Sequence, residues 1–179
     1  NGLTMMRLVL VVPFGILLFN YGTEPAARAA AAFIFVIASL TDYADGALAR
    51  KQGLVTTFGK IADPLADKAL TGVALIGLSY LGELPWWVTI VILAREIAVT
   101  LLRFWVIRHG VIAASRGGKA KTATLIVAIL MYLLPLTGFL LTAREWVMGL
   151  AVILAVVTGV DYLVRALKLR ATTSGNSAS

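Results

Sequence analysis

Four aspartates stand in two pairs inside the apolar stretches of this chain. Asp42 and Asp45 are three positions apart, and Asp63 and Asp67 are four positions apart. On a helix these spacings place both carboxylates of a pair on one face. Ionised groups at membrane depth are costly unless they are paired or hydrated, and they usually mark a functional site. Four carboxylates brought together would repel one another, so the pattern predicts a bound cation between them.

The residue types around the aspartates indicate which cation and which ligand. Carboxylate oxygens favour Mg²⁺ or Mn²⁺, and the chain has no cysteine and a single histidine to offer zinc. Two such ions would suit displacement at phosphorus. Gly46 and Ala49 leave space beside the metals, Gly59 allows close backbone approach, and Arg50 can bind phosphate through two hydrogen bonds. At this stage a proton or cation pathway lined by acidic residues is an alternative interpretation.

The composition defines the elements that must position these residues. Of 179 residues, 60% are hydrophobic and 14% are charged, and the mean hydropathy is +0.91. Apolar runs of about 20 residues are long enough to cross a bilayer core. We therefore expect an all-α polytopic membrane protein, with one six-helix domain over 1–170 and a disordered cytoplasmic tail over 171–179. The predicted spans are 4–21, 29–50, 60–81, 86–108, 119–141 and 146–168, with polar connections at 22–25, 82–85 and 142–145.

The distribution of basic residues predicts the orientation of these spans. Lys and Arg gather on the cytoplasmic side of membrane proteins. With six spans, the opposite side holds only Arg28 and Arg144, so both termini are expected in the cytoplasm. The net charge of +7 then reflects topology and anionic lipid, not nucleic acid, because no soluble basic module remains. A cleaved secretory signal is disfavoured, since Arg28 and a second span follow at once.

The complete acidic pattern resembles the signature of the CDP-alcohol phosphotransferase family. Residues 42–50 read Asp-x-x-Asp-Gly-x-x-Ala-Arg, and residues 59–67 read Gly-x-x-x-Asp-x-x-x-Asp. All eight signature residues are present at the spacing of the family. The expectation of six spans, made separately, also agrees with that family. The resemblance implies an enzyme that transfers a phosphatidyl group from CDP-diacylglycerol to an alcohol and releases CMP.

The resemblance also implies roles for individual residues. It assigns two Mg²⁺ or Mn²⁺ ions to the four aspartates, and it makes Asp67 the general base for the acceptor hydroxyl. It further implies a homodimer in the bacterial inner membrane, with its active site facing the cytoplasm. The residues expected to bind the nucleotide end of CDP-diacylglycerol are Thr4, Gly46, Ala49, Arg50 and Gly59.

Other segments bear on the acceptor alcohol. Residues 1–7, 94–103, 118–122 and 159–162 resemble the branch of the family that uses sn-glycerol 3-phosphate and makes phosphatidylglycerophosphate. A phosphomonoester carries nearly two negative charges and needs several cationic donors. Acceptors such as phosphatidylglycerol, in cardiolipin synthesis, or inositol phosphate remain alternatives, and an acid-lined cation transporter is an alternative of another class. An alternative role for the predicted acceptor-phosphate ligands is only to set topology and bind lipid headgroups. These ligands are Arg103, Lys119, Lys121 and Arg165.

The remaining charged and aromatic residues are expected to be structural. Arg95 lies deep in a span and is expected to pair with an acidic residue, and Asp161 is expected to anchor Arg95 or Arg165. The only histidine, His109, is expected in a solvated loop. Interfacial anchoring is expected for Trp86, Trp87 and Trp146.

Overall fold

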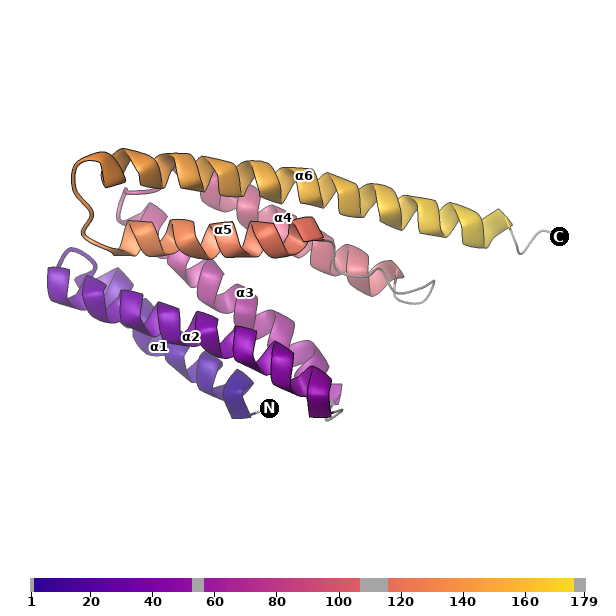
Figure 1. The fold of residues 1–179 in the computed structure, drawn as a ribbon, viewed down its shortest axis with the longest axis horizontal. Coiled ribbons are helices and arrows are strands. Elements are labelled where there is room, and N and C mark those ends of the chain that lie inside the picture. Colours follow the sequence, from indigo (N-terminus) through magenta and orange to yellow (C-terminus); the bar gives the residue numbers. More distant parts are fainter. Residues whose placement is uncertain (1, 53–56, 107–115, 176–179) are drawn as a thin grey trace.

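The described part of the chain forms six helices in the computed structural model (Figure 1). The structure describes residues 2–52, 57–106 and 116–175, and the side chains of 5–41, 68–102, 104–105 and 117–169. These described ranges contain no strand, which confirms the all-α prediction. The helices are α1 (Gly2–Tyr21), α2 (Pro25–Gln52), α3 (Thr57–Tyr80), α4 (Trp86–Val106), α5 (Arg116–Leu133) and α6 (Phe139–Gly175).

Proline and glycine set the connections at one end of the bundle. Pro25 opens α2, where its missing N–H costs nothing. Between α3 and α4, Gly82 has a φ of 75°, a conformation that residues with a Cβ rarely adopt. Between α5 and α6, Gly138 has a φ of 61°. Pro135 lies three residues before Gly138 and disfavours helical backbone at Leu134.

The last of these turns corrects one sequence prediction. The fifth span was expected to run to residue 141, with its connection at 142–145. Instead α5 ends at Leu133 and α6 begins at Phe139, so the predicted connection lies inside α6. Pro135 and Gly138 end the fifth helix before the chain reaches the polar residues 142–145, which were expected to form the connection. At its other end α6 continues to Gly175, into the segment expected to be a tail.

The helices run back and forth between two ends of the molecule. Figure 1 shows the turns after α1, α3 and α5 at one end, and both termini toward the other. The C-terminus of α2 and the N-terminus of α3 lie together at the end of the termini. Helix α6 has 37 residues, or roughly 55 Å at 1.5 Å per residue. It therefore extends well past the others in Figure 1.

Apolar side chains from all the helices except α6's C-terminal part form one core. Helix α1 packs on α2 and α3, α6 packs on α4 and α5, and α3 also contacts α2, α4 and α5. Phe14 of α1 and Phe35 of α2 are fully buried, with ring centroids 5.9 Å apart. The core continues through Leu75, Leu78 and Ile129 into the α5 side of the bundle.

Small residues bring α1 and α3 into close contact. A Cβ at Gly77 would lie 2.3 Å from Cδ2 of Leu18, which is itself fully buried. A Cβ at Gly15 would lie 3.4 Å from Cγ1 of Val73. Close approach through small residues is the usual basis of helix packing in membranes, where lipid is as apolar as the core.

The outer surface of the bundle is apolar as well. On α1, Val9 is 68% exposed and Val12 is 62% exposed, and α6 exposes Ile153 and Val157 to a similar degree. Such a surface suits contact with lipid. By length and hydropathy, one helix of the described residues, over 139–169, is apolar enough to cross a membrane. Shorter apolar helices within the described residues cover 5–21, 25–41 and 68–80.

A buried ionic cluster joins the helices at the end of the turns. Arg28 of α2 forms a two-pronged ion pair with Glu83, in the turn before α4, and also donates to the carbonyls of Tyr132 and Leu133. Nη1 of Arg144, on α6, lies 3.5 Å from the same Glu83 carboxylate, and its guanidinium covers the Tyr132 ring at 4.5 Å. The only two basic residues expected on that side of the membrane therefore share one acidic partner.

The contact between α1 and α3 gives the first prediction. Gly77→Ala places a methyl group against Leu18, and overpacking of this kind typically costs about 1–3 kcal/mol. We expect a lower thermal unfolding midpoint for the variant in detergent. Gly149→Ala on α6 is the matched control, because a Cβ there would meet nothing within 4 Å. A Gly77→Ala protein as stable as this control would show that α1 and α3 separate easily.

Candidate active site

The four aspartates lie on two helix ends that meet. Asp42 and Asp45 lie in the last turns of α2, and Asp63 and Asp67 lie in the first half of α3. The two helices contact each other, and Figure 1 shows these ends at the same end of the bundle. The backbone thus places both pairs at one end of the bundle. Their side chains lie outside the described part of the structure.

The other predicted donor-site residues share this location. Gly46, Ala49 and Arg50 belong to the last turns of α2, Gly59 belongs to the first turn of α3, and Thr4 belongs to the first turn of α1. Their side chains also lie outside the described ranges. Because α1 and α2 are antiparallel neighbours, the first turns of α1 and the last turns of α2 lie at the same end. The four aspartates themselves suit a hard divalent cation, since aspartate supplies only oxygen ligands.

Arg7 is a buried cation near this end of the bundle. From the sequence, Arg7 is one of the many basic residues expected on the cytoplasmic side, but it is only 2% exposed in α1. A guanidinium removed from solvent requires a compensating charge or hydrogen bonds. Arg7 therefore belongs to the interior of the bundle, toward the end that carries the aspartates. No feature of the sequence pattern distinguished it from the exposed basic residues.

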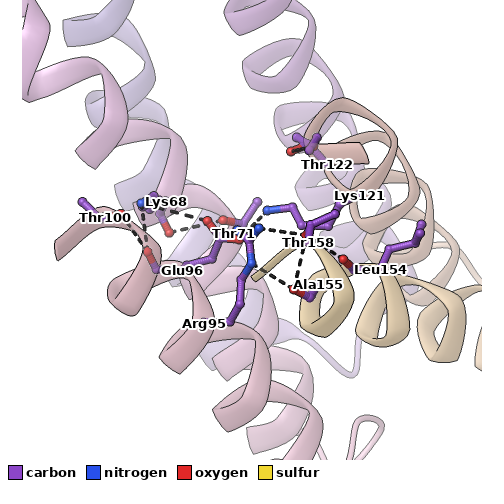
Figure 2. A network of polar contacts seen from close by, with 11 residues as sticks. Lys68, Thr71, Arg95, Glu96, Thr100, Lys121, Thr122, Leu154, Ala155 and Thr158 are labelled. Carbon is purple, nitrogen blue, oxygen red and sulfur yellow. Dashed lines mark hydrogen bonds and ion pairs between the residues drawn. The ribbon is translucent and has the colours of Figure 1, made fainter. Parts of the chain in front are cut away.

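A second polar centre lies between α3, α4, α5 and α6, around Glu96 (Figure 2). Lys121 of α5 donates to Oε1 of Glu96, and Nη1 of Arg95 contacts the same oxygen at 2.9 Å. The main-chain carbonyl of Glu96 accepts from Nζ of Lys68 at 3.1 Å and from Oγ1 of Thr100 at 2.7 Å. Nζ of Lys68 also lies 4.0 Å from Oε2 of Glu96. We call Lys68, Arg95, Glu96 and Lys121 the Glu96 cluster.

Helix α6 fixes the arginine of this cluster. Nε of Arg95 donates to the carbonyl of Ala155 at 3.0 Å, and Nη2 donates to Oγ1 of Thr158 at 2.8 Å. Gly159 makes room for this side chain, because a Cβ there would lie 3.1 Å from Cγ of Arg95. The guanidinium therefore uses all three of its nitrogens within the protein. The expectation that Arg95 pairs with an acidic residue is confirmed, and the partner is Glu96, the next residue in the chain.

The Glu96 cluster adjoins the acidic site through α3. Lys68 directly follows Asp67, so their Cα atoms are about 3.8 Å apart. Lys121 belongs to the second turn of α5 and comes from one of the predicted acceptor-site segments. Through Glu96, the tertiary structure thus connects α3, which carries the expected base Asp67, with Lys121, which was expected to bind the acceptor phosphate. Sequence analysis missed Glu96 as the centre of this arrangement, although a Glu inside an apolar helix was a usable signal.

The predicted acceptor-phosphate residues have different environments. Lys121 is buried at 6% exposure and paired with Glu96, whereas Lys119, two residues earlier, is exposed. Arg165 is exposed and pairs with Asp161 at 3.0 Å, one turn away on α6. The anchoring role expected of Asp161 therefore applies to Arg165. The side chain of Arg103, on α4, and His109 lie outside the described ranges. Trp86, Trp87 and Trp146 are exposed at the end of the turns.

Comparison with known proteins establishes the family. The family model described as CDP-alcohol phosphatidyltransferase matches residues 1–157. This match covers all the residues of the acidic signature and the Glu96 cluster. The chain belongs to the CDP-alcohol phosphatidyltransferase family, as its signature indicated.

Curated relatives narrow the similarity further. A protein of Mycobacterium tuberculosis (strain H37Rv) named probable phosphatidylglycerophosphate synthase is 55% identical over 169 residues, which cover 94% of this chain and 81% of the relative. A protein of Bacillus subtilis (strain 168) named CDP-diacylglycerol--glycerol-3-phosphate 3-phosphatidyltransferase is 40% identical, over 90% of this chain and 91% of its own. A protein of Escherichia coli (strain K12) with the same name is 39% identical, over 71% of each chain.

Proposed function

We propose that this protein transfers the phosphatidyl group of CDP-diacylglycerol to sn-glycerol 3-phosphate, giving phosphatidylglycerophosphate and CMP. The observation that carries the proposal is the 55% identity, over nearly the whole chain, to a relative named for this product. The eight-residue signature on the adjoining ends of α2 and α3 supports it. The reaction belongs to membrane phospholipid synthesis.

The net chemistry is a displacement at phosphorus. A hydroxyl oxygen of glycerol 3-phosphate forms a bond to the β-phosphorus of CDP-diacylglycerol, and the bond from that phosphorus to the oxygen of the departing CMP breaks. The hydroxyl proton passes to a base, for which we propose Asp67. A carboxylate acts in this way when it lies within hydrogen-bond reach of the hydroxyl. Holding both substrates beside it supplies the proximity that such a step requires.

We propose that Asp42, Asp45, Asp63 and Asp67 hold two divalent cations, Mg²⁺ or Mn²⁺. Such ions, when bound, polarise the phosphoryl group and offset the negative charge that develops on the leaving CMP. The first turns of α3 and the last turns of α2 hold the carboxylates on rigid helices. Gly46, Ala49 and Gly59 keep the neighbouring surface small for the nucleotide end of the donor, with Arg50 and Thr4 as its polar contacts.

The proposed setting is the inner membrane of a bacterium. All six helices would span the bilayer, and both termini and the acidic site would face the cytoplasm, where CDP-diacylglycerol presents its headgroup. The apolar outer surface of α1 and α6 supports contact with lipid. We further propose a homodimer, in keeping with the family resemblance. Positive charge in the neighbourhood of Lys119 and Lys121 favours an acceptor with a phosphate over an uncharged alcohol.

The acceptor preference is the first test of this function. Purified protein with CDP-diacylglycerol and Mg²⁺ should release CMP with glycerol 3-phosphate, and not with free glycerol, serine, inositol phosphate or phosphatidylglycerol. Product lipid and CMP would be measured together. A preference for another member of the panel would replace the acceptor and keep the family. Ion flux through reconstituted protein without CMP release would instead support an acid-lined transporter.

The metal site gives a second test. Asp42→Asn, Asp45→Asn and Asp63→Asn should each abolish turnover and weaken Mn²⁺ binding, because an amide is a poorer ligand than a carboxylate for a hard dication. Turnover and Mn²⁺ affinity would be measured on the same preparations. Glu145→Gln, an exposed acidic residue of α6 at the end of the turns, is the matched control and should change neither. Near-normal activity at low Mg²⁺ in any aspartate variant would remove that residue from the site.

A third test separates the acceptor from the donor. Neutralising Lys119 or Lys121 removes a charge-assisted hydrogen bond of about 1.5–3 kcal/mol, so the KM for glycerol 3-phosphate should rise about tenfold to a hundredfold. The KM for CDP-diacylglycerol should change little. Arg50→Ala should show the opposite pattern. Arg103→Ala and Arg165→Ala would show whether those residues belong with the acceptor. Equal effects on both substrates would mean that these cations bind bulk anionic lipid.

A further inference from the structure

Lys121 has an unusual environment for a residue expected to bind substrate. Its side chain is 8% exposed, and its ammonium contacts the carboxylate of Glu96, which is 16% exposed. Arg95 contacts the same carboxylate oxygen. Among the described residues, Glu96 is the carboxylate that both cations share. Two cations on one carboxylate leave a positive charge inside the bundle, which an arriving anion would neutralise.

The two cations differ in how firmly they are held. Arg95 is bound to α6 through Ala155 and Thr158 and enclosed by Gly159. Lys121 is held through its contact with Glu96, at the end of a side chain with four rotatable bonds. Figure 2 shows the lysine reaching from α5 toward the carboxylate, and the arginine lying between that carboxylate and α6. Movement of the ammonium to a new anion therefore requires only that Lys121 leave Glu96.

We propose that Glu96 is a positioning residue that stands in for the acceptor phosphate. Without acceptor, the carboxylate of Glu96 holds Lys121 inside the bundle. When glycerol 3-phosphate binds, its phosphate takes over the ammonium, while Arg95 keeps Glu96 in place. This inference rests on the proposed function, because it takes the anion to be the phosphate of the acceptor.

The location of the cluster gives this exchange a consequence for the reaction. Lys68, which contacts Glu96, directly follows Asp67 in α3. The acceptor phosphate would therefore bind beside the helix that carries the proposed base. A carboxylate that competes for Lys121 makes every incoming anion break the same ion pair, and a phosphate dianion has more charge than a monoanion with which to offset that cost.

The test uses the full chain in detergent and inorganic phosphate as the probe. Thermal unfolding midpoints would be measured over a range of phosphate concentrations at constant ionic strength, because a ligand of the folded state raises the midpoint according to its affinity. Glu96→Gln should unfold at a lower temperature than the wild type without phosphate, since buried cations lose their partner. Its affinity for phosphate should rise about tenfold, because the competing carboxylate is gone. The KM for glycerol 3-phosphate should fall in parallel.

Glu83→Gln is the matched control at the other end of the bundle. Glu83 is also a largely buried carboxylate that balances two basic residues, Arg28 and Arg144. The control should lower the midpoint as well, but its phosphate affinity should equal that of the wild type. An equal gain in phosphate affinity in both variants would reduce the effect to a general property of buried cations and overturn the proposal.

A double variant covers the case in which Glu96→Gln does not fold. Glu96→Gln combined with Lys121→Met removes both charges of the pair, so the midpoint should recover while phosphate affinity falls below that of the wild type. Unchanged phosphate affinity in both Glu96 variants would overturn the role of Glu96. If the wild type turns over with glycerol 3-phosphate in that case, the proposed function stands. If the wild type releases no CMP with this acceptor, the proposed function fails whatever the phosphate titrations give.

Discussion

Charges buried in an apolar bundle must be balanced by partners on other helices, and this requirement organises the molecule. The core and the outer surface are both apolar, so the hydrophobic contrast that sorts residues in a soluble protein is weak here. Polar contacts between helices then carry much of the specificity. The two ionic centres serve opposite ends: Glu83 gathers Arg28 and Arg144 at the turns, and Glu96 gathers Arg95 and Lys121 toward the acidic end.

The two centres differ in what their geometry permits. At Glu83, the two-pronged contact with the carboxylate and the carbonyls of Tyr132 and Leu133 leave Arg28 little freedom, which suits a permanent connection between helices. At Glu96, only Arg95 is fixed in this way, and Lys121 depends on a single carboxylate. The proposed exchange of an ion pair at Glu96, at the end away from the turns, would suit a charged substrate that enters from that side.

The position of Glu96 connects the proposed acceptor site with the proposed metal site. The acidic signature lies on α2 and α3, whereas the basic residues that suit the acceptor come from α4, α5 and α6. Helix α3 belongs to both, because Asp67 and Lys68 are consecutive residues on neighbouring faces of one helix. The contact of Lys68 with Glu96 therefore sets the distance between the two halves of the proposed site.

The sequence by itself determined the helical class, the six helices found in the described residues, the family and the residues of the acidic signature. These follow from local features: long apolar runs form helices, and carboxylates three and four positions apart share a helix face. The predicted end of the fifth helix was wrong, because Pro135 and Gly138 end α5 before the chain reaches the polar residues 142–145. Only the tertiary structure decided that Lys121 and Arg95 share Glu96, that Arg7 is buried and that Arg28 and Arg144 meet at Glu83. Apart from the pairing of Arg95 with Glu96, these contacts join residues far apart in the chain. The partner of a buried charge depends on which helices pack together, and hydrophobic periodicity alone does not specify that packing.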